Sequence, residues 1–574
     1  MSNVYGIDLG TTYSAISYIN PETSRAEIIR NAEGRDTTPS IVYFESPTNI
    51  VVGDVAKEAG RAGPEESQRV VNFVKREMHD KTWTREFFGK EWNPVEISSL
   101  ILQKLVNDAR TSEGHEVKDV VITCPAYFGK EERTRTRQAG EAIGLNVLEI
   151  LDEPVAAALN YGLEQSNVKG KNIIVYDLGG GTFDVTVISI GNDPDKTEIS
   201  VVCTAGDHQL GGYNWDQKII DYFVSEFETA TGTSISVEED PDGYNETMYD
   251  LKVGAENRKI ELKSRSSVIQ TIRFGTERYQ CTLTREKFDG LTKELLQTTL
   301  NLTDKVVKEA SDKGVKIDTW LLVGGSTRMP QVHEALAERY GLTENENLFE
   351  YDPDKAVAKG AAKEAQVVSI TGILRKGFGE TDEPTNPSIG DGGIPTLPSN
   401  ERDLQNAATE AGMTTEQLRN MAGIVTNKAA TKSYGIGATD ENDVYRVTIL
   451  IKRNTQVPFR GTLVEQKPFG APGGDSIKLE VFSSDETDDV VDIAQCEILE
   501  DNETRLSEIP FELPAPVVRG APIAIKFELD DQGNLELFAT DLTSGQSKKA
   551  RFTAGLTEAQ MEEAKQKLSM VTVS

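Results

Sequence analysis

The stretch YDLGGGTFDVTV, residues 176 to 187, decides how the fold of this sequence is interpreted. Three consecutive glycines separate an apolar run that ends near an aspartate from a second run with the alternation of a β-strand. Glycine lowers stability inside a strand, so a triplet is expected where the backbone turns tightly or approaches a ligand closely. Taken alone, the stretch predicts an ordinary β-hairpin, and a ligand site is the alternative.

A second copy of this pattern lies near the start of the sequence. Residues 4 to 19, VYGIDLGTTYSAISYI, again place Asp-Leu-Gly between two strand-like runs, and two hydroxyl residues follow the glycine. The two turns match at Asp8 and Asp177 and at Gly10 and Gly179. Two such hairpins far apart in one chain favour an internally duplicated fold whose halves face one ligand.

The residue types in the two turns indicate a metal-bound nucleotide. Backbone N–H groups of a Gly/Thr turn can converge on phosphate oxygens, and the hydroxyls of Thr11, Thr12 and Thr182 add donors. The carboxylates of Asp8 and Asp177 would repel phosphate unless a hard cation stood between them. Mg2+ prefers one or two carboxylates together with phosphate and water, so we expect Mg2+ at this site.

Length, charge and cysteine usage exclude several classes of protein. A chain of 574 residues is too long for one core, and a prior of roughly 150 residues per domain gives about four units. The net charge of -32 argues against a nucleic-acid partner. Four dispersed cysteines without a CxxC motif fit a reducing compartment and no zinc site. No run reaches the roughly eighteen apolar residues of a membrane span, so we expect a cytoplasmic protein without a membrane partner.

The first two regions of the chain differ in their hydrophobic pattern. Residues 1 to 366 alternate β-rich and helical segments, which predicts an α/β architecture with mixed sheets. Residues 367 to 425 begin with a Gly/Pro-rich tract and end in a short helical segment. Thr414 and Gln417 stand in the relation of a capping box at the start of that segment. We therefore expect a nucleotide-binding domain followed by a linker.

The last two regions predict a second domain and a helical tail. Residues 426 to 554 contain runs that alternate apolar and polar residues with period two, which predicts a small all-β sandwich. Residues 555 to 574 predict one short helix with Thr557 as its N-cap, followed by a tail.

Eight motifs along the chain resemble a known family. In order they are VYGIDLGTTYS, VVITCPAYF, ILDEPVAAALNYGL, VYDLGGGTFDV, GDHQLGGYNWD, AENRKIEL, LLVGGSTRMPQV and DPDKAVAKGAA. Together they resemble the nucleotide-binding domain of the 70-kDa heat-shock chaperones of the DnaK type, over roughly residues 1 to 366. SYGIGA, IKRNTQVPF and DLTSGQSKKARF are similar to that family's β-domain, but more weakly. The resemblance implies an α/β actin-like ATPase domain with duplicated halves, followed by a small all-β sandwich.

The resemblance also implies the residues of a nucleotide site. Lys75, Glu153, Asp177 and Thr182 would be catalytic, and Asp8, Asp177 and Asp184 would lie around Mg2+ and a K+ ion. Phosphoryl transfer needs charge neutralisation and an oriented in-line water more than covalent help, which suits a lysine, a metal and a carboxylate. The implied nucleotide-binding residues are Gly10, Thr11, Thr12, Tyr13, Gly179, Gly180, Gly181, Gly211, Gly212, Glu256, Lys259, Lys263, Gly324, Gly325, Arg328 and Asp354.

Some positions of the site depart from the family pattern, and others match its interdomain relay. Lys263 stands where the family has a serine, and Val155 stands where it has a threonine. The planar guanidinium of Arg328 suits stacking on a base. Pro125 and Arg133 match the relay through which the family couples its nucleotide site to the partner domain.

The combined interpretation is an ATP-dependent chaperone-like ATPase. It would bind ATP and ADP with Mg2+, hydrolyse ATP, and bind extended apolar segments of unfolded polypeptides. A J-domain co-chaperone and a nucleotide-exchange factor are partners that the family implies. The alternatives are a chaperone-like module that holds ATP without cycling, a small-molecule kinase of the same superfold, and an actin-like filament former.

Two larger departures concern the coupling of the domains. The family's short leucine-rich linker is replaced by residues 367 to 425, and the helical lid that follows the sandwich in the family is almost absent. We expect the Gly/Pro tract to behave partly as a loose tether. The alternative is that the segment 401 to 422 docks on the nucleotide domain and restores a rigid connection.

Overall fold

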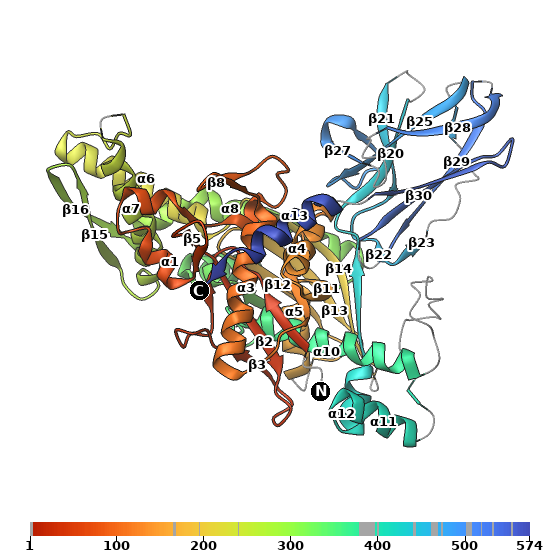
Figure 1. Cartoon of the computed structure of the whole chain (residues 1–574), viewed down its shortest axis with the longest axis horizontal. Coiled ribbons are helices and arrows are strands. Elements are labelled where there is room, and N and C mark those ends of the chain that lie inside the picture. Colours follow the sequence, from red (N-terminus) through yellow and green to blue (C-terminus); the bar gives the residue numbers. More distant parts are fainter. Residues whose placement is uncertain are drawn as a thin grey trace.

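The structure is a computed structural model of the whole chain. It describes residues 4–164, 168–193, 196–238, 240–377, 397–398, 401–439, 444–460, 469–471, 474–500, 508–517, 519–530, 533–552 and 555–574. Most of the predicted Gly/Pro-rich tract therefore lies outside the described residues. Figure 1 shows a large α/β body and a β-sandwich, drawn in blue, that projects from one edge of it.

The first half of the α/β body is built on the β-hairpin that begins the chain. Strand β1 (Val4–Asp8) turns into β2 (Tyr13–Ile19), which pairs with β3 (Ala26–Ile29). On its other side β1 pairs in parallel with β10 (Asp119–Cys124), which pairs in parallel with β11 (Asn146–Asp152). The strand order is therefore β11-β10-β1-β2-β3.

The second half repeats this order with the same strand directions. Strand β12 (Asn172–Leu178) turns into β13 (Phe183–Ile190), which pairs with β14 (Thr197–Asp207). On its other side β12 pairs in parallel with β17 (Thr319–Val323), and β17 with β18 (Leu348–Glu350). The order β18-β17-β12-β13-β14 matches that of the first half strand by strand. The predicted internal duplication is confirmed.

Two helices pack between the two sheets. Helix α10 (Ala356–Gly377) covers β1, and α5 (Glu153–Glu164) covers β12 and β13. A Cβ at Gly360 would overlap the backbone oxygen of Ala156, and one at Gly6 would overlap the backbone of Ala362. Glycine is needed at both positions because the helices and the sheet touch backbone to backbone.

The remaining elements of the α/β body surround this centre. A small sheet contains β5 (Val42–Phe44), β6 (Asn49–Val52) and β7 (Val70–Val71), and β4 (Thr38–Pro39) pairs with β2. The other elements are α1 (Asp54–Ala59), α2 (Pro64–Gln68), η1 (Val74–Glu77), β8 (Arg85–Phe87), β9 (Lys90–Trp92), α3 (Pro94–Glu113), α4 (Lys130–Ala142), α6 (Gly212–Thr231), α7 (Pro241–Glu261), β15 (Ser267–Phe274), β16 (Glu277–Thr284), α8 (Arg285–Asp312), η2 (Gly325–Arg328) and α9 (Pro330–Tyr340).

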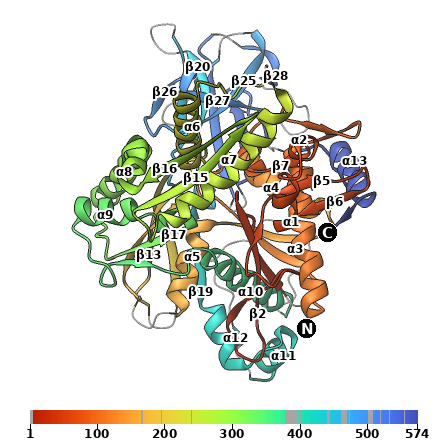
Figure 2. The same ribbon diagram turned by 90° about the vertical axis from the view of Figure 1, so that its left-hand side faces the viewer.

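The linker segment docks on the α/β body. Helices α11 (Glu401–Ala411) and α12 (Thr415–Ala422) pack on α10, and their shared core includes Leu374, Leu404 and Leu418. The predicted capping box of Thr414 and Gln417 is present. Figure 2 shows both helices beneath α10. The rigid alternative that the sequence left open is therefore the observed arrangement of residues 401 to 422.

A strand directly after α12 extends the second half of the α/β body. Strand β19 (Ile424–Ala429) pairs in parallel with β14, from Thr197 with Ile424 to Ser200 with Asn427. The sequence predicts that the sandwich begins at residue 426, whereas residues 424 to 429 belong to a sheet of the α/β body. A strand-like run indicates a strand, but not which of two neighbouring sheets receives it. Strand β22 (Gln456–Val457) then pairs with β19.

The second domain is the predicted β-sandwich. One sheet contains β20 (Ser433–Thr439), β21 (Tyr445–Ile451), β25 (Gly474–Ser484), β26 (Val490–Asp492), β27 (Cys496–Leu499) and β28 (Glu508–Val517), with η3 (Ile493–Gln495) at its edge. The other contains β23 (Phe459–Arg460), β24 (Phe469–Gly470), β29 (Pro522–Leu529), β30 (Leu535–Asp541) and β31 (Ser547–Phe552). Ile436, Phe511 and Phe527 belong to the apolar core between the sheets.

The segment after the sandwich returns to the first half of the α/β body. Helix α13 (Glu558–Ser569) has Thr557 as its N-cap, as predicted, and it packs on α3 and α4. Strand β32 (Thr572–Val573) then pairs in parallel with β6, through Thr572 with Asn49 and Val573 with Ile50. Figure 2 shows this segment beside β5 and β6. The helix follows the sequence prediction, whereas the added strand was not predicted.

No helix among the described residues combines the length and the apolar character needed to cross a bilayer.

Candidate active site

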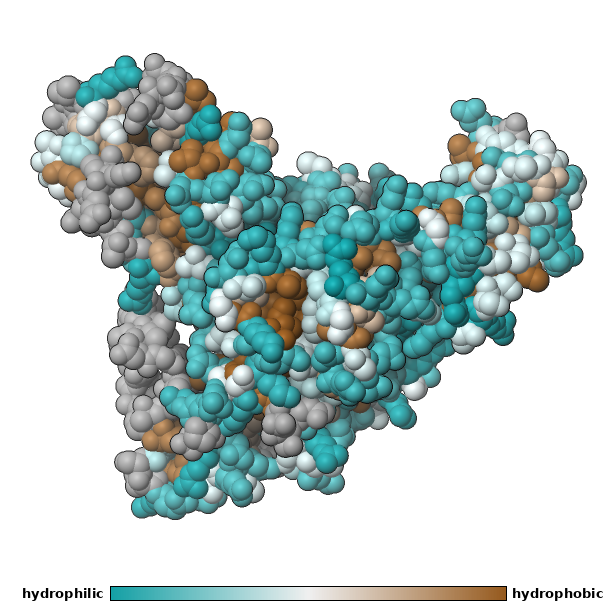
Figure 3. All heavy atoms as spheres, turned by 180° about the vertical axis from the view of Figure 1, so that it is seen from behind, coloured by the Kyte–Doolittle hydropathy of each residue, from teal (hydrophilic) through white to brown (hydrophobic). Residues whose placement is uncertain are grey.

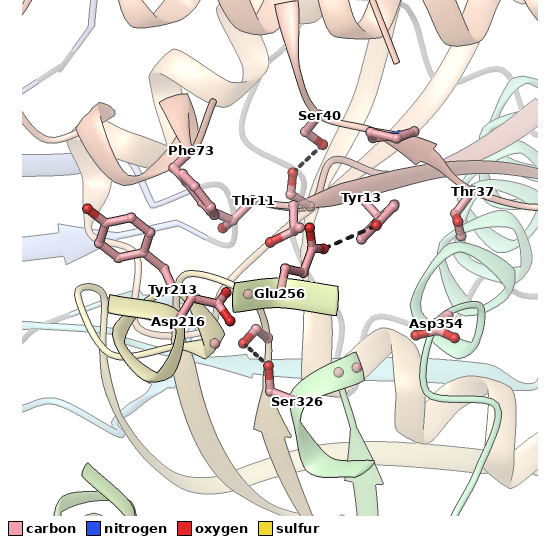
Figure 4. Close-up of a pocket in the computed structure, with 18 of the residues that line it drawn as sticks. Thr11, Tyr13, Thr37, Ser40, Phe73, Tyr213, Asp216, Glu256, Ser326 and Asp354 are labelled. Atoms are coloured by element: carbon pink, nitrogen blue, oxygen red, sulfur yellow. Dashed lines mark hydrogen bonds between the residues drawn. The ribbon is translucent and has the colours of Figure 1, made fainter. Parts of the chain in front are cut away.

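A cavity of about 490 Å³ lies between the two halves of the α/β body. Its walls include the turn after β1, the turn after β12, the start of α6, helix α7 and the segment before α10. Figure 4 shows side chains from both halves that point into this space. The cavity has a size typical of a small-molecule site.

The two hairpin turns contact each other at the wall of the cavity. A Cβ at Gly180 would overlap the hydroxyl of Thr12, and a Cβ at Gly181 would overlap the side chain of Thr11. The backbone of Gly181 is also covered by Gly211, where a Cβ would stand 2.5 Å from the Gly181 carbonyl carbon. The glycine triplet is therefore required because the threonines of the first turn stand directly against the backbone of the second.

One hydroxyl at this contact lacks a partner. The Oγ1 atom of Thr12 is buried and makes no hydrogen bond to any residue that the structure describes. A buried hydroxyl without a partner costs free energy, so a ligand acceptor at this position would be favourable. The donor set of the facing turns fits phosphate oxygens.

A buried ion pair crosses the same region. The Nζ atom of Lys75 lies 2.6 Å from Oε1 of Glu153, and both side chains are buried. Lys75 lies in η1, which begins directly after Phe73, and the φ of 58° at Phe73 is in the left-handed region. Burial opposes the lysine charge, but the carboxylates of Glu153 and Asp8 raise the pKa of Lys75 above its ordinary value.

Three aspartates stand around the ion pair. Burial and the charge of Glu153 raise the pKa of Asp8 to about 7, and the same two causes raise the pKa of Asp177 and Asp184 well above the ordinary range. Oγ1 of Thr123 donates to Asp8 at 3.3 Å. Such carboxylates attract a cation, because a positive charge would offset the cost of burying them.

The aspartates fit a hydrated cation better than one that the protein alone coordinates. Within the described part of the chain, no three carboxylate, imidazole or thiol side chains gather as direct ligands of one metal ion. Mg2+ usually keeps several waters and takes one or two carboxylates together with phosphate. The donor set of Asp8 and Asp177 fits this mode of binding.

The opposite end of the cavity is lined by charged side chains in pairs. Arg328 contacts Asp354 at 2.6 Å, and Lys259 contacts Asp216 at 2.8 Å. Glu256 accepts a hydrogen bond from the hydroxyl of Tyr13 at 3.2 Å, which joins the two halves (Figure 4).

Comparison with known proteins shows which family the chain belongs to. The family model described as Hsp70 protein matches residues 4–375. The chain belongs to the Hsp70 family. The chaperone protein DnaK of Thermosipho melanesiensis is 40% identical over 372 residues, which cover 64% of this chain and 59% of that protein. The chaperone protein DnaK of Thermotoga petrophila is 40% identical over 375 residues, which cover 64% of this chain and 60% of that protein. The matched region therefore spans about three fifths of these relatives.

The family and the fold class predicted from the sequence are confirmed by this match and by the strand order. The Hsp70 match ends at residue 375, close to the end of α10. The docked helices, β19, the sandwich and α13 lie beyond the matched residues.

Most site residues implied by the resemblance line the Hsp70 cavity. These are Asp8, Gly10, Thr11, Thr12, Tyr13, Lys75, Glu153, Asp177, Gly179, Gly180, Thr182, Gly212, Glu256, Lys259, Lys263, Gly324, Gly325, Arg328 and Asp354. Gly181, Gly211 and Asp184 lie behind the lining. Gly181 and Gly211 form the backbone contact described above, and Asp184 accepts a hydrogen bond from the backbone N–H of Tyr127 at 3.0 Å.

Lys263 lines the rim of the cavity. Its side chain is 51% exposed, and its Nζ atom lies 3.7 Å from Glu350. Glu350 also accepts a hydrogen bond from Arg328 at 3.1 Å. The lysine that departs from the family pattern therefore joins the ion pairs formed by Arg328 at this end of the cavity.

Several lining residues were not found from the sequence. Phe73 and Tyr213 contact each other across the cavity with ring centroids 4.7 Å apart, and Ser326 donates to the backbone oxygen of Gly179 at 2.9 Å. Ser40 and Asp216 also line the cavity (Figure 4). Tyr213 and Asp216 lie within the quoted motif GDHQLGGYNWD, from which only the two glycines were predicted as nucleotide contacts, whereas Phe73 and Ser40 lie outside the quoted motifs.

Proposed function

We propose that this Hsp70 protein binds MgATP between the two halves of its α/β body and hydrolyses it to MgADP. The observation that carries this proposal is the contact of the two hairpin turns around a cavity that holds the buried pair of Lys75 and Glu153. The family membership supports it, because both relatives named above are chaperones.

The two turns would bind the phosphates. The backbone N–H groups of residues 180 and 181 and the hydroxyls of Thr11 and Thr12 would supply donors without net charge. Asp8 and Asp177 would hold Mg2+ through water, and this ion would neutralise charge on the phosphate oxygens. Asp184 stands behind them, where it would support the same cation site and a neighbouring K+ ion.

Lys75 and Glu153 would act on the terminal phosphate. The ammonium group of Lys75 would stabilise negative charge that grows on the transferred group, and Glu153 would orient the attacking water. The contact between the two side chains fixes their relative position before a substrate enters. Positioning of this kind reduces the reorganisation needed in the transition state.

The nucleoside would occupy the end of the cavity lined by Glu256, Lys259, Gly324, Gly325 and Arg328. A planar guanidinium suits stacking on a base, and Arg328 is held by Asp354 at the edge of the cavity. A Cβ at Gly324 would meet the backbone of Leu178, so glycine allows this segment to approach the second hairpin closely.

The sandwich would bind extended apolar peptide. Val447, Ile449, Phe482 and Val491 form an apolar cluster that is separate from the main core of the sandwich. Ile493 and Ile498 are large apolar side chains exposed beside this cluster. Figure 3 shows hydrophobic surface on the sandwich, at upper left, whereas most of the α/β body is hydrophilic. A J-domain co-chaperone and a nucleotide-exchange factor are further proposed partners.

Melting and turnover measurements together test this proposal. MgATP at about 100 times its dissociation constant should add roughly 2.7 kcal/mol to the free energy of unfolding, and Asp177→Ala should lose most of this gain. Turnover should then be measured with and without an apolar model peptide. No shift in melting would overturn the nucleotide assignment. Stabilisation without turnover would favour a module that binds ATP without cycling, and stimulation by a sugar would favour a kinase.

A further inference from the structure

A second cavity, of about 380 Å³, lies where the sandwich meets the α/β body. One wall is helix α4, the second is β11 with the segment from β19 to β20, and the third is the turn between β29 and β30. This cavity shares no lining residue with the nucleotide site. Its charged lining residues are Lys130, Arg133, Arg137, Lys428, Asp152 and Asp530.

The cations from α4 lie along one side of the helix. Lys130, Arg133, Thr134 and Arg137 are spaced three, four and seven residues from the first, and side chains at this spacing share a helix face. The face therefore presents three positive charges and one hydroxyl to the cavity.

Most of these charges already have partners. Arg133 contacts Asp152 at 2.5 Å, Lys428 contacts Glu149, and Arg137 donates to the backbone oxygen of Val147. Lys130 differs from them. Its Nζ atom is buried and makes no hydrogen bond to any acceptor in the part of the chain that the structure describes.

An ammonium group in this position is costly. Burial lowers the pKa of Lys130 to about 8, although Asp530, Glu131 and Glu536 attract its charge. The group is therefore still mostly protonated at neutral pH, and its hydrogen-bonding capacity is unused. A bound anion would accept hydrogen bonds from the ammonium group and offset its buried positive charge. Such charge-assisted hydrogen bonds are among the strongest in proteins.

We infer that this interdomain cavity binds a small tetrahedral oxyanion of the phosphate class, with Lys130 as its principal ligand. Thr134 supplies a neutral donor on the same helix face, and the guanidinium groups of Arg133 and Arg137 add positive potential. The cavity is large enough for such an ion together with water. Since both domains line the cavity, a bound anion stabilises the docked arrangement of the sandwich.

Calorimetric titration with inorganic phosphate tests this inference. The nucleotide site is first saturated with Mg2+ and a non-hydrolysable ATP analogue, so that phosphate cannot bind between the hairpin turns. Lys130→Met should weaken phosphate binding about tenfold or more. Lys305→Met is the matched control, because Lys305 is an exposed lysine of α8, and it should leave the affinity unchanged. Equal affinities of the wild type and Lys130→Met would overturn the inference.

Thermal melting separates ligand binding from a structural role of Lys130. Without phosphate, Lys130→Met should melt no lower than the wild type, because it removes an amine that has no partner. Phosphate should raise the melting temperature of the wild type and not that of the variant. An equal drop for the variant with and without phosphate would show a purely structural lysine. Succinate that binds more tightly than phosphate would overturn the ligand class.

This inference is independent of the proposed function. The comparison of the wild type with Lys130→Met can be repeated without any nucleotide, and the difference between the two proteins should persist. A protein that fails to bind ATP but shows this difference would disprove the proposed function alone.

Discussion

The two halves of the α/β body share one strand order but bring different chemistry to the cavity between them. The first half contributes side chains, namely Thr11, Thr12 and Lys75. At the contact of the hairpin turns the second half contributes bare backbone at residues 180 and 181, whereas its side chains, such as Glu256 and Arg328, line other parts of the cavity. The difference shows how two similar hairpins can pack against each other at a site. Glycines in the second turn leave the space that the threonine side chains of the first turn occupy.

The halves also differ in the strand that each receives from outside. Strand β19, which precedes the sandwich, extends the main sheet of the second half through four paired residues. Strand β32, which follows the sandwich, extends the small sheet of the first half through two paired residues. The segments before and after the sandwich are therefore paired with different halves. A change in the angle between the halves would move β19 and β32 relative to each other.

The largest expected effect comes from filling the glycine side of the hairpin contact. Gly180→Val should abolish stabilisation by MgATP, because the new side chain would overlap Thr12. Thr12→Val removes one hydroxyl and should weaken MgATP binding by about 0.5–1.5 kcal/mol. Melting with and without MgATP measures both. If Thr12→Val lost more of the stabilisation by MgATP than Gly180→Val, the bare backbone at Gly180 would not be the critical part of the hairpin contact.

The second effect concerns turnover. Lys75→Ala and Glu153→Ala should each lower kcat about a hundredfold or more, because their proposed roles belong to the transition state. The affinity for MgATP should change much less. Steady-state turnover together with equilibrium binding measures the two quantities. Equal losses of rate and affinity would show that both residues are ground-state ligands.

The third effect concerns the strand that the first half receives. Val573 is buried in β32, whereas its neighbour Thr572 is exposed. Val573→Asp should lower the free energy of unfolding by about 1.5–3 kcal/mol, the amount expected for exposing a buried valine. Thr572→Asp is the matched control and should have little effect. Denaturant unfolding measures both, and similar values for the two variants would contradict the pairing of β32 with β6.

The last effect concerns β19 and is spread over several pH units. Glu364 in α10 accepts a hydrogen bond from Thr426 of β19 at 2.9 Å. Burial, and then the charge of Glu149, raise the pKa of Glu364 from 4.5 to about 8, while Lys428 opposes the rise. The docked strand therefore favours the protonated carboxyl. Docking should be strongest below pH 4.5, weaken as the pH rises, and level off above about 8.

Hydrogen exchange of the amides of residues 424 to 429 measures this dependence. After correction for intrinsic exchange, protection should fall by about tenfold or less for each pH unit up to 8. Glu364→Gln should flatten the profile, because glutamine does not titrate in this range. An unchanged profile in this variant would assign the pH dependence to other groups.

The hairpins and the sandwich could be predicted because their patterns are local. Asp8 ends β1, and Asp177 is the penultimate residue of β12, each before a glycine turn. The period-two runs after residue 433 indicate strands without reference to a partner. The N-caps Thr414 and Thr557 were predicted for the same reason, since a cap depends on residues three positions away.

The strands β19 and β32 could not be placed from the sequence. Each is short, and the sequences IVTNKA and TV carry little alternation. Their partners lie far away in the chain, so no local pattern identifies them. The contacts of Phe73 with Tyr213 were missed for a related reason, because two ordinary aromatic residues meet only after the halves have closed on each other.

The position of β32 sets an order for folding. Its partner β6 lies near the start of the chain, and the second half and the sandwich are both synthesised before residues 572 and 573 are available. Contacts with so large a separation form slowly, because a long loop must close first. Until then β6 has an open edge, and an open edge can pair with other chains. The first half of this Hsp70 protein is thus completed after the second half and the sandwich, and its small sheet keeps an unpaired edge until then.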